Sequence, residues 1–156
     1  MTNVLVTYFS ASGVTKNIAD KIAVDNGYDS FEIRPAEAYT PEDLDWTDKN
    51  SRSTIEMADK TFRPPIAESC DISGYDTVVI GFPVWWYTAP TIINTFIESV
   101  DLTGKTIKPF CTSGGSGIEK CVSDLANAYP ELDFKNGLRL TGMEDSEAIK
   151  NWIEGE

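Results

Sequence analysis

The sequence predicts an α/β fold in which a five-stranded parallel sheet lies between two layers of helices. Apolar, β-prone runs alternate along the chain with segments whose apolar residues recur at helical spacing. The run Asp76–Phe82 is almost continuously apolar, which is typical of a strand covered on both faces. At 156 residues the chain has the size of one domain with a full core, so we expect a single domain over residues 1–156.

The chain begins with a strand, a tight loop and a helix. Residues 4–9 are apolar and β-prone, the small or hydroxylic residues Ser10–Thr15 follow, and Ile18–Ala23 carry apolar residues at helical spacing. A helix N-terminus has free backbone N–H groups and a partial positive charge, so this loop suits a phosphate. A helix start that binds no ligand would show the same pattern and is the alternative.

The remaining elements alternate in the same way. A second strand is expected at residues 30–33, where Pro35 ends it. Later strands are expected at residues 76–82, 106–112 and 137–140. Helices are expected at residues 51–61, where Ser51 or Ser53 can cap the start, and at residues 91–100, 118–128 and 145–153, where apolar residues gather on one side.

A long, polar connection from Arg34 to Tyr75 interrupts this alternation. Connections of this length in compact domains are often functional. We expect Trp46, which lies within it, to pack on the edge of the core; the alternative is that it covers a ligand. Acidic residues at 43, 45 and 48 resemble a calcium loop, but the required glycine and glutamate are missing, so no metal site is predicted.

The composition excludes several classes of function. The net charge is −12 and the sequence pI is about 4.3, so the surface should repel nucleic acid and anionic membranes. The chain has no histidine, which excludes Ser-His-Asp and Cys-His catalysis and histidine-ligated zinc. An enzyme built from this chain would therefore need a cofactor for its chemistry.

The cysteines and the start of the chain indicate the cytoplasm. Cys70, Cys111 and Cys121 form no Cys-x-x-Cys pair, so we expect buried free thiols; a redox pair of the last two is the alternative. The first residues show no signal-peptide pattern, and no apolar run approaches the ~20 residues of a membrane span. We expect a soluble, cytoplasmic protein, and nothing in the sequence demands more than a monomer.

Three unusual loops follow the first, third and fourth expected strands, at Ser10–Thr15, Pro83–Tyr87 and Thr112–Gly117. In a parallel sheet of order 2-1-3-4-5 the carboxyl ends of these strands are neighbours, so the loops can meet around one ligand. The second loop supplies two tryptophans and a tyrosine, which suit a flat ring but could also pack on neighbouring loops or bind a partner. The glycine-rich third loop offers backbone N–H groups, or is a plain turn.

These motifs resemble those of the flavodoxin family over nearly the whole chain. The first loop is similar to the family's phosphate loop, Thr/Ser-x-Thr/Ser-Gly-x-Thr, at Ser10, Ser12, Gly13 and Thr15. Residues 81–86 resemble the branch with a Gly-x-Pro-x-Trp-Trp ring loop, and the chain looks like a short-chain member with an uninterrupted last strand. The resemblance implies a flavodoxin-like three-layer sandwich, sheet order 2-1-3-4-5, and FMN as cofactor.

The resemblance also assigns roles to the three loops. Phosphate would be held by Ser10, Ala11, Ser12, Gly13, Val14 and Thr15. The ring would be held by Pro83, Val84, Trp85, Trp86 and Tyr87, and its polar edge by Thr112, Ser113, Gly114, Gly115 and Gly117. Many flavodoxins carry an aromatic residue in the third loop, and this chain has none there. Stacking would then come from the tryptophans, or one ring face would stay open, as suits a reductase.

The leading hypothesis is an FMN-binding, low-potential electron carrier rather than a turnover enzyme. A carboxylate at ~10 Å, with an effective dielectric constant of ~20, disfavours an anionic reduced flavin by roughly 1–2 kcal/mol. Redox proteins with basic docking patches are the expected partners. The alternatives are an FMN-dependent NAD(P)H:quinone-type oxidoreductase and, less favoured, a non-flavin interaction module with the same fold.

Overall fold

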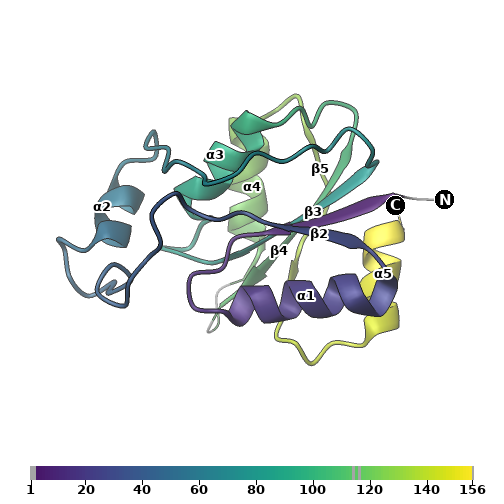
Figure 1. Cartoon of the computed structure of the whole chain (residues 1–156), viewed down its shortest axis with the longest axis horizontal. Coiled ribbons are helices and arrows are strands. Elements are labelled where there is room, and N and C mark those ends of the chain that lie inside the picture. The colour runs from purple at the N-terminus through teal and green to yellow at the C-terminus, as the bar shows by residue number, and fades with distance from the viewer. Residues whose placement is uncertain (1–2, 114, 116, 156) are drawn as a thin grey trace.

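A parallel sheet lies between two layers of helices in the computed structural model, which describes residues 3–113, 115 and 117–155. Helices α1 (Val14–Asn26) and α5 (Ser146–Glu154) cover one face of the sheet, and α3 (Thr91–Ser99) and α4 (Glu119–Ala128) cover the other (Figure 1). The predicted three-layer α/β sandwich is confirmed. No helix within these described ranges is long and apolar enough to cross a membrane.

The strand order confirms the order predicted from the sequence. The strands are β1 (Val4–Tyr8), β2 (Asp29–Glu32), β3 (Thr77–Pro83), β4 (Thr106–Thr112), β5 (Asp133–Phe134) and β6 (Leu138–Arg139). Over the described residues the sheet has six strands in the order β2-β1-β3-β4-β5, with β6 also paired to β4, and every pair is parallel. The short strands β5 and β6 share the fifth place of the predicted order.

The last strand is interrupted, whereas the sequence predicted one unbroken strand. The N–H of Lys135 donates to the carbonyl of Ile107 at 2.9 Å, and the N–H of Leu140 donates to the carbonyl of Cys111 at 2.8 Å. Between these two acceptors lies Pro109, which has no N–H to offer the neighbouring strand. Between these two hydrogen bonds the last strand advances five residues, from 135 to 140, while β4 advances only four, from 107 to 111. The extra residue in the last strand forms a bulge.

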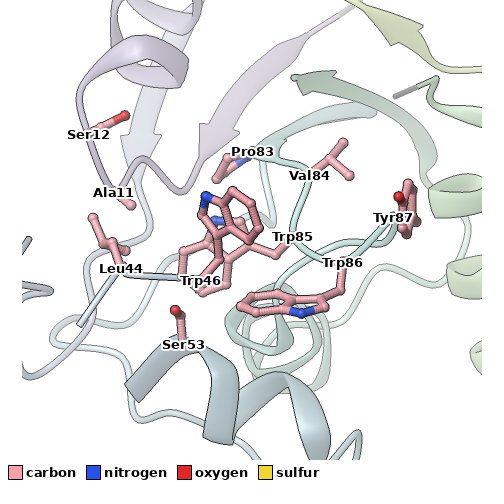
Figure 2. A pocket seen from close by; sticks show the side chains of 10 residues that line it. All are labelled: Ala11, Ser12, Leu44, Trp46, Ser53, Pro83, Val84, Trp85, Trp86 and Tyr87. Carbon is pink, nitrogen blue, oxygen red and sulfur yellow. The ribbon is translucent and has the colours of Figure 1, made fainter. Parts of the chain in front are cut away.

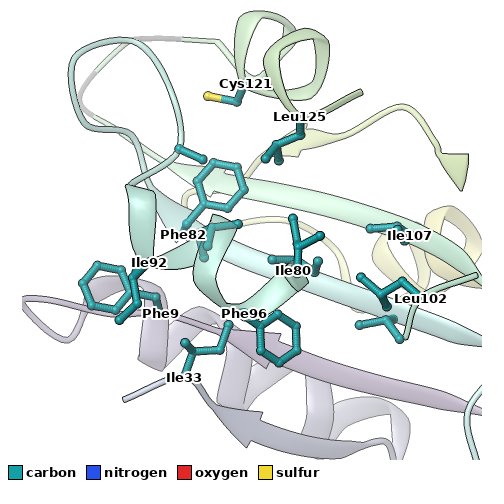
Figure 3. Close-up of a cluster of buried hydrophobic side chains, with 14 of the residues drawn as sticks. Phe9, Ile33, Ile80, Phe82, Ile92, Phe96, Leu102, Ile107, Cys121 and Leu125 are labelled. Atoms are coloured by element: carbon teal, nitrogen blue, oxygen red, sulfur yellow. The ribbon is translucent and has the colours of Figure 1, made fainter. Parts of the chain in front are cut away.

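The central strands carry the core on both faces. On one face Ile80 and Phe82 of β3 belong to the same buried cluster as Ile92 and Phe96 of α3 (Figure 3). On the other face Val79 of the same strand lies in the cluster that β1 forms with α1 and α5. The continuous apolar run of β3 therefore reflects burial on both sides, as predicted.

A buried lysine on β4 fastens the end of α5. Lys108 is only 3% exposed, and its Nζ donates to the carbonyls of Trp152 at 2.8 Å and Gly155 at 2.9 Å. Burial lowers the pKa of Lys108. A cation at the last carbonyls of a helix satisfies acceptors that have no partner within the helix.

The long connection between β2 and β3 is closed at its base. Ala36 donates its N–H to the carbonyl of Pro65, and Ala67 donates to that of Arg34, both at 2.8 Å. We call residues 36–65 the connecting segment. It contains α2 (Arg52–Ala58), which lies away from the sheet on the side where the carboxyl ends of the central strands point (Figure 1).

Candidate functional site

The structure brings the three predicted loops to one edge of the sheet. The N–H of Val84 donates to the carbonyl of Thr112 at 3.0 Å, which joins the loops after β3 and β4. The hydroxyls of Thr15 and Thr112 lie 2.8 Å apart and are both buried, which joins the loop after β1 to the loop after β4. Direct hydrogen bonds therefore hold the three loops together.

The first loop leaves the start of α1 open. The hydroxyl of Ser10 accepts a hydrogen bond from the N–H of Gly13 at 3.0 Å. Gly13 has a φ of 95°, a conformation that favours glycine, and a Cβ added there would meet no atom within 4 Å. Gly13 is also the N-cap of α1 and makes no side-chain capping bond. The first backbone N–H groups of α1 can therefore serve an anion.

The second loop closes in a strained turn. The backbones of Trp85 and Thr88 exchange hydrogen bonds of 2.9 and 3.1 Å. Between them Trp86 and Tyr87 have φ values of 49° and 66°, in the left-handed region that costs a non-glycine residue roughly 1–2 kcal/mol. The hydroxyl of Thr88 donates to Asp124 of α4 at 2.7 Å and holds the turn against that helix. Strain of this kind is concentrated at binding sites.

A cavity of about 600 Å³ lies beside this turn, and we call it the tryptophan cavity. Its lining residues come from the first loop, the second loop and the connecting segment (Figure 2). They are Ala11, Ser12, Leu44, Trp46, Ser53, Pro83, Val84, Trp85, Trp86 and Tyr87. None of these side chains is charged, so the cavity favours a neutral ligand surface.

A second cavity of about 430 Å³ lies on the other side of the second loop. Its lining residues include the third loop and the chain that follows β6. They are Val14, Pro83, Val84, Trp85, Thr112, Ser113, Leu140 and Thr141. Residues 83–85 thus form a partition that both cavities share.

Most of the predicted site residues line these two cavities, and the others lie close to them in the chain. Ser10 lines a separate cavity of about 430 Å³ beside β2. Gly13 shapes the first loop, and Thr15 is buried in the hydrogen bond described above. Gly115 and Gly117 are exposed and line neither cavity, while Gly114 lies outside the described residues.

Two lining residues of the tryptophan cavity, Leu44 and Ser53, were missed in the sequence, and a third, Trp46, was considered there only as the less favoured alternative. The expectation that Trp46 packs on the core edge is wrong, because the residue is 73% exposed and lines the cavity. Its position in a long polar connection was the only signal in the sequence. Periodicity does not show where such a connection returns to the fold.

Tyr39 anchors the connecting segment to the body of the protein. Its ring lies edge-on to those of Phe9 and Trp85, with centroids 5.7 and 5.4 Å away. Its hydroxyl donates to Glu56 of α2, and burial together with this bond raises the pKa of Tyr39. The segment is thus packed against the second loop.

Arg52 contacts several parts of the connecting segment around Tyr39. Its guanidinium carbon lies 3.8 Å from the centroid of the Tyr39 ring. The same group donates to Glu56 at 2.9 Å and to the carbonyls of Glu37 and Ala38 at 2.8 and 3.2 Å. Arg52 therefore links residues 37–38, near the start of the connecting segment, to α2, and Trp46 lies between these two parts of the chain.

The cysteines are free thiols, and Cys111 and Cys121 are buried as predicted, while Cys70 is half-buried. Burial raises the pKa of Cys111 to about 12 and that of Cys121 to about 11. The Cys121 thiol faces the Tyr87 carbonyl at 3.9 Å, behind the second loop. No group of three His, Cys, Asp or Glu side chains within the described residues could hold a metal ion.

A model of the flavodoxin family matches residues 3–156 of this chain. No curated protein matches it. Among solved structures, a candidate flavoprotein from Bacteroides eggerthii is 46% identical, with a TM-score of 0.94, over 99% of this chain and 97% of that one. A second, from Bacteroides uniformis, is 45% identical, with a TM-score of 0.91, over 98% of each chain.

One further structure was solved with a ligand. The flavoprotein from Lactobacillus acidophilus, in complex with FMN, is 25% identical to this chain, with a TM-score of 0.74. The match covers 97% of this chain and 99% of that one.

Proposed function

This chain belongs to the flavodoxin family, and we propose that it binds FMN and transfers electrons. The observation that carries the proposal is the hydrogen-bonded meeting of three ligand-suited loops at the carboxyl ends of β1, β3 and β4. This edge is the topological switch point, where ligands bind in sheets of this order. The FMN complex of the Lactobacillus acidophilus protein supports the choice of ligand.

The loops fit the parts of FMN. The open start of α1 and the hydroxyls of Ser10 and Ser12 would hold the phosphate without a basic side chain. The partition at residues 83–85, with the indole of Trp85, would orient the ring and keep water from it. Backbone N–H groups of the third loop would meet its polar edge. Bound FMN would supply the reversible redox chemistry that these side chains lack.

The charge of the molecule favours electron carriage at low potential. With a net charge of −12, the field of the whole molecule would disfavour added negative charge on the cofactor. The same negative charge would steer redox partners that carry basic docking patches toward this protein. We expect the carrier to act as a monomer. The free thiols fit a reducing compartment, and we place the protein in the cytoplasm.

FMN binding is tested by titrating the purified protein into FMN and measuring flavin fluorescence. We expect strong quenching at a ratio of one to one, and no quenching would contradict the proposal. Trp85→Ala should weaken FMN binding by about tenfold, because a stacked aromatic wall contributes roughly 0.5–1.5 kcal/mol beyond area burial. Val24→Ala, on the far side of α1 and outside both cavities, is the control.

Electron transfer is tested by anaerobic photoreduction of the FMN-loaded protein, followed by absorbance. Two separate one-electron steps would support a carrier. A single two-electron step would favour an FMN-dependent NAD(P)H:quinone-type reductase. The open tryptophan cavity beside the second loop supports that alternative, because it could hold a substrate. Rapid steady-state oxidation of NAD(P)H by the loaded protein alone would establish that alternative.

A further inference from the structure

Ser53 presents a buried, unsatisfied hydroxyl to the tryptophan cavity. The residue is 2% exposed, and its Oγ has no hydrogen-bond partner in the part of the chain that the structure describes. Figure 2 shows this hydroxyl directed from α2 toward Trp46. Leaving a buried hydroxyl without a partner is unfavourable, so native proteins rarely do it without a ligand or water to complete the bond.

Hydrogen bonds and contacts of the neighbouring backbone and side chains position Ser53 beside the cavity. The N–H of Ser53 donates to the carbonyl of Asp43 at 2.9 Å, across the connecting segment. The preceding residue, Arg52, is fixed by the contacts with Tyr39 and Glu56 described above. These contacts tie the backbone at Ser53 to the chain opposite it and to the body of the protein.

Two indoles border the same space. Trp46 is 73% exposed and Trp86 is 41% exposed, and both line the cavity together with Leu44 (Figure 2). Large aromatic surfaces left in water are unfavourable, and a flat ring between them would cover both. The left-handed turn that places Trp86 here is strained, as expected where a side chain is held for a ligand.

We propose that the tryptophan cavity is a subsite for a planar aromatic or quinoid ring that carries a carbonyl at its edge. Ser53 donates its hydroxyl hydrogen to that carbonyl, and the indoles of Trp46 and Trp86 cover the ring. The uncharged lining selects a neutral ring. The inference rests on the proposed function in one respect, because such a ring comes either from FMN itself or from a second molecule that receives electrons from it.

Ser53→Ala separates the two sources. FMN is titrated into the FMN-free protein, and menadione, a naphthoquinone, is titrated by calorimetry into both the FMN-free and the FMN-loaded protein. Loss of one buried hydrogen bond should weaken binding about fivefold to tenfold. Weaker FMN binding identifies the ring as that of FMN, whereas weaker menadione binding with unchanged FMN affinity identifies a second ring. If neither affinity changes, the subsite assignment is wrong.

Thr91→Val is the matched control for this variant. Thr91 carries the other buried hydroxyl without a partner among the described residues, but it lines a different cavity, beside α4. It should leave both affinities unchanged. Failure of the wild-type protein to bind FMN would count against the proposed function alone, since the menadione titration of the FMN-free protein still reports on Ser53.

Trp46→Leu tests the aromatic wall independently. Because Trp46 is exposed, the variant should fold with an unchanged melting temperature. It should bind FMN or menadione, whichever the Ser53→Ala titrations identify as the ligand, roughly threefold to tenfold more weakly. Phe62→Leu, at another exposed aromatic residue of the connecting segment that does not line the cavity, is the control. Equal affinities of Trp46→Leu and wild type would remove Trp46 from the subsite.

Discussion

The buried thiols of Cys111 and Cys121 should resist alkylation in the folded protein. Burial holds the pKa of Cys111 at about 12 and that of Cys121 at about 11, so both stay protonated at pH 8. Iodoacetamide at pH 8 should alkylate the half-buried Cys70 and spare the other two until urea unfolds the protein. Peptide mass spectrometry reads the outcome, and early alkylation of Cys111 would contradict it.

The raised pKa of Cys111 also carries a pH dependence. Its contribution to stability is fully present below the unfolded pKa of 9 and is lost as the pH rises toward the folded value of about 12. Urea unfolding of Cys111→Ala should therefore show a smaller loss of stability between pH 8 and pH 11 than wild type. Parallel pH profiles would refute this.

Gly81 is required by the packing of the sheet. A Cβ added to it would lie 2.2 Å from Cζ of Phe110, a buried ring on β4. Gly81→Ala should lower the free energy of unfolding by about 1–3 kcal/mol through overpacking. Gly74→Ala is the control in urea unfolding, because a Cβ there would meet no atom within 4 Å.

Among the elements, α5 depends on one side chain of β4. Lys108→Met removes the donor to the last carbonyls of the helix and should lower stability by about 1–3 kcal/mol. Hydrogen exchange should rise in α5, while FMN affinity should not change, because α5 lines neither cavity of the site. Lys150→Met, at an exposed position of the same helix, should leave the exchange as it is.

The connecting segment depends on Arg52 in a similar way. Arg52→Lys keeps the charge but loses the planar fork that reaches Glu56 and two carbonyls at once. We expect trypsin and other proteases to cut residues 36–65 several times faster in this variant. Lys60→Arg, at an exposed position, is the control, and equal cleavage rates would show that the segment does not need the planar fork of Arg52.

At this scale the sequence predicted the regular parts well, because periodicity reports burial. The continuous apolar run of β3 and the helical spacing of α3 placed both elements correctly. The split of the last strand was missed, since β5 has only two residues, too few for any pattern. Ser53 was missed, and Trp46 was wrongly expected at the core edge, because both positions follow from how the connecting segment returns to the fold, which no local pattern encodes.

Charge acts on the molecule as a whole. With 25 acidic and 13 basic residues, the folded chain repels itself more than the expanded chain does. Raising NaCl from 10 to 200 mM shortens the Debye length from about 30 Å to below 10 Å, so the melting temperature should rise by a few degrees. A melting temperature that falls with salt would show that ion pairs such as Arg63–Glu98 outweigh the repulsion.

The closed base of the connecting segment has a consequence for how such proteins diversify. Hydrogen bonds at Ala36 and Ala67 bring the two ends of the segment together, and the packing of Tyr39 and the ion pair of Arg63 with Glu98 hold it to the body of the protein. A segment joined in this way can change in length and sequence while the strands and the three loops keep their positions. Evolution, or a protein engineer, could exchange the segment as a cassette and so alter what the cavity accepts without rebuilding the fold.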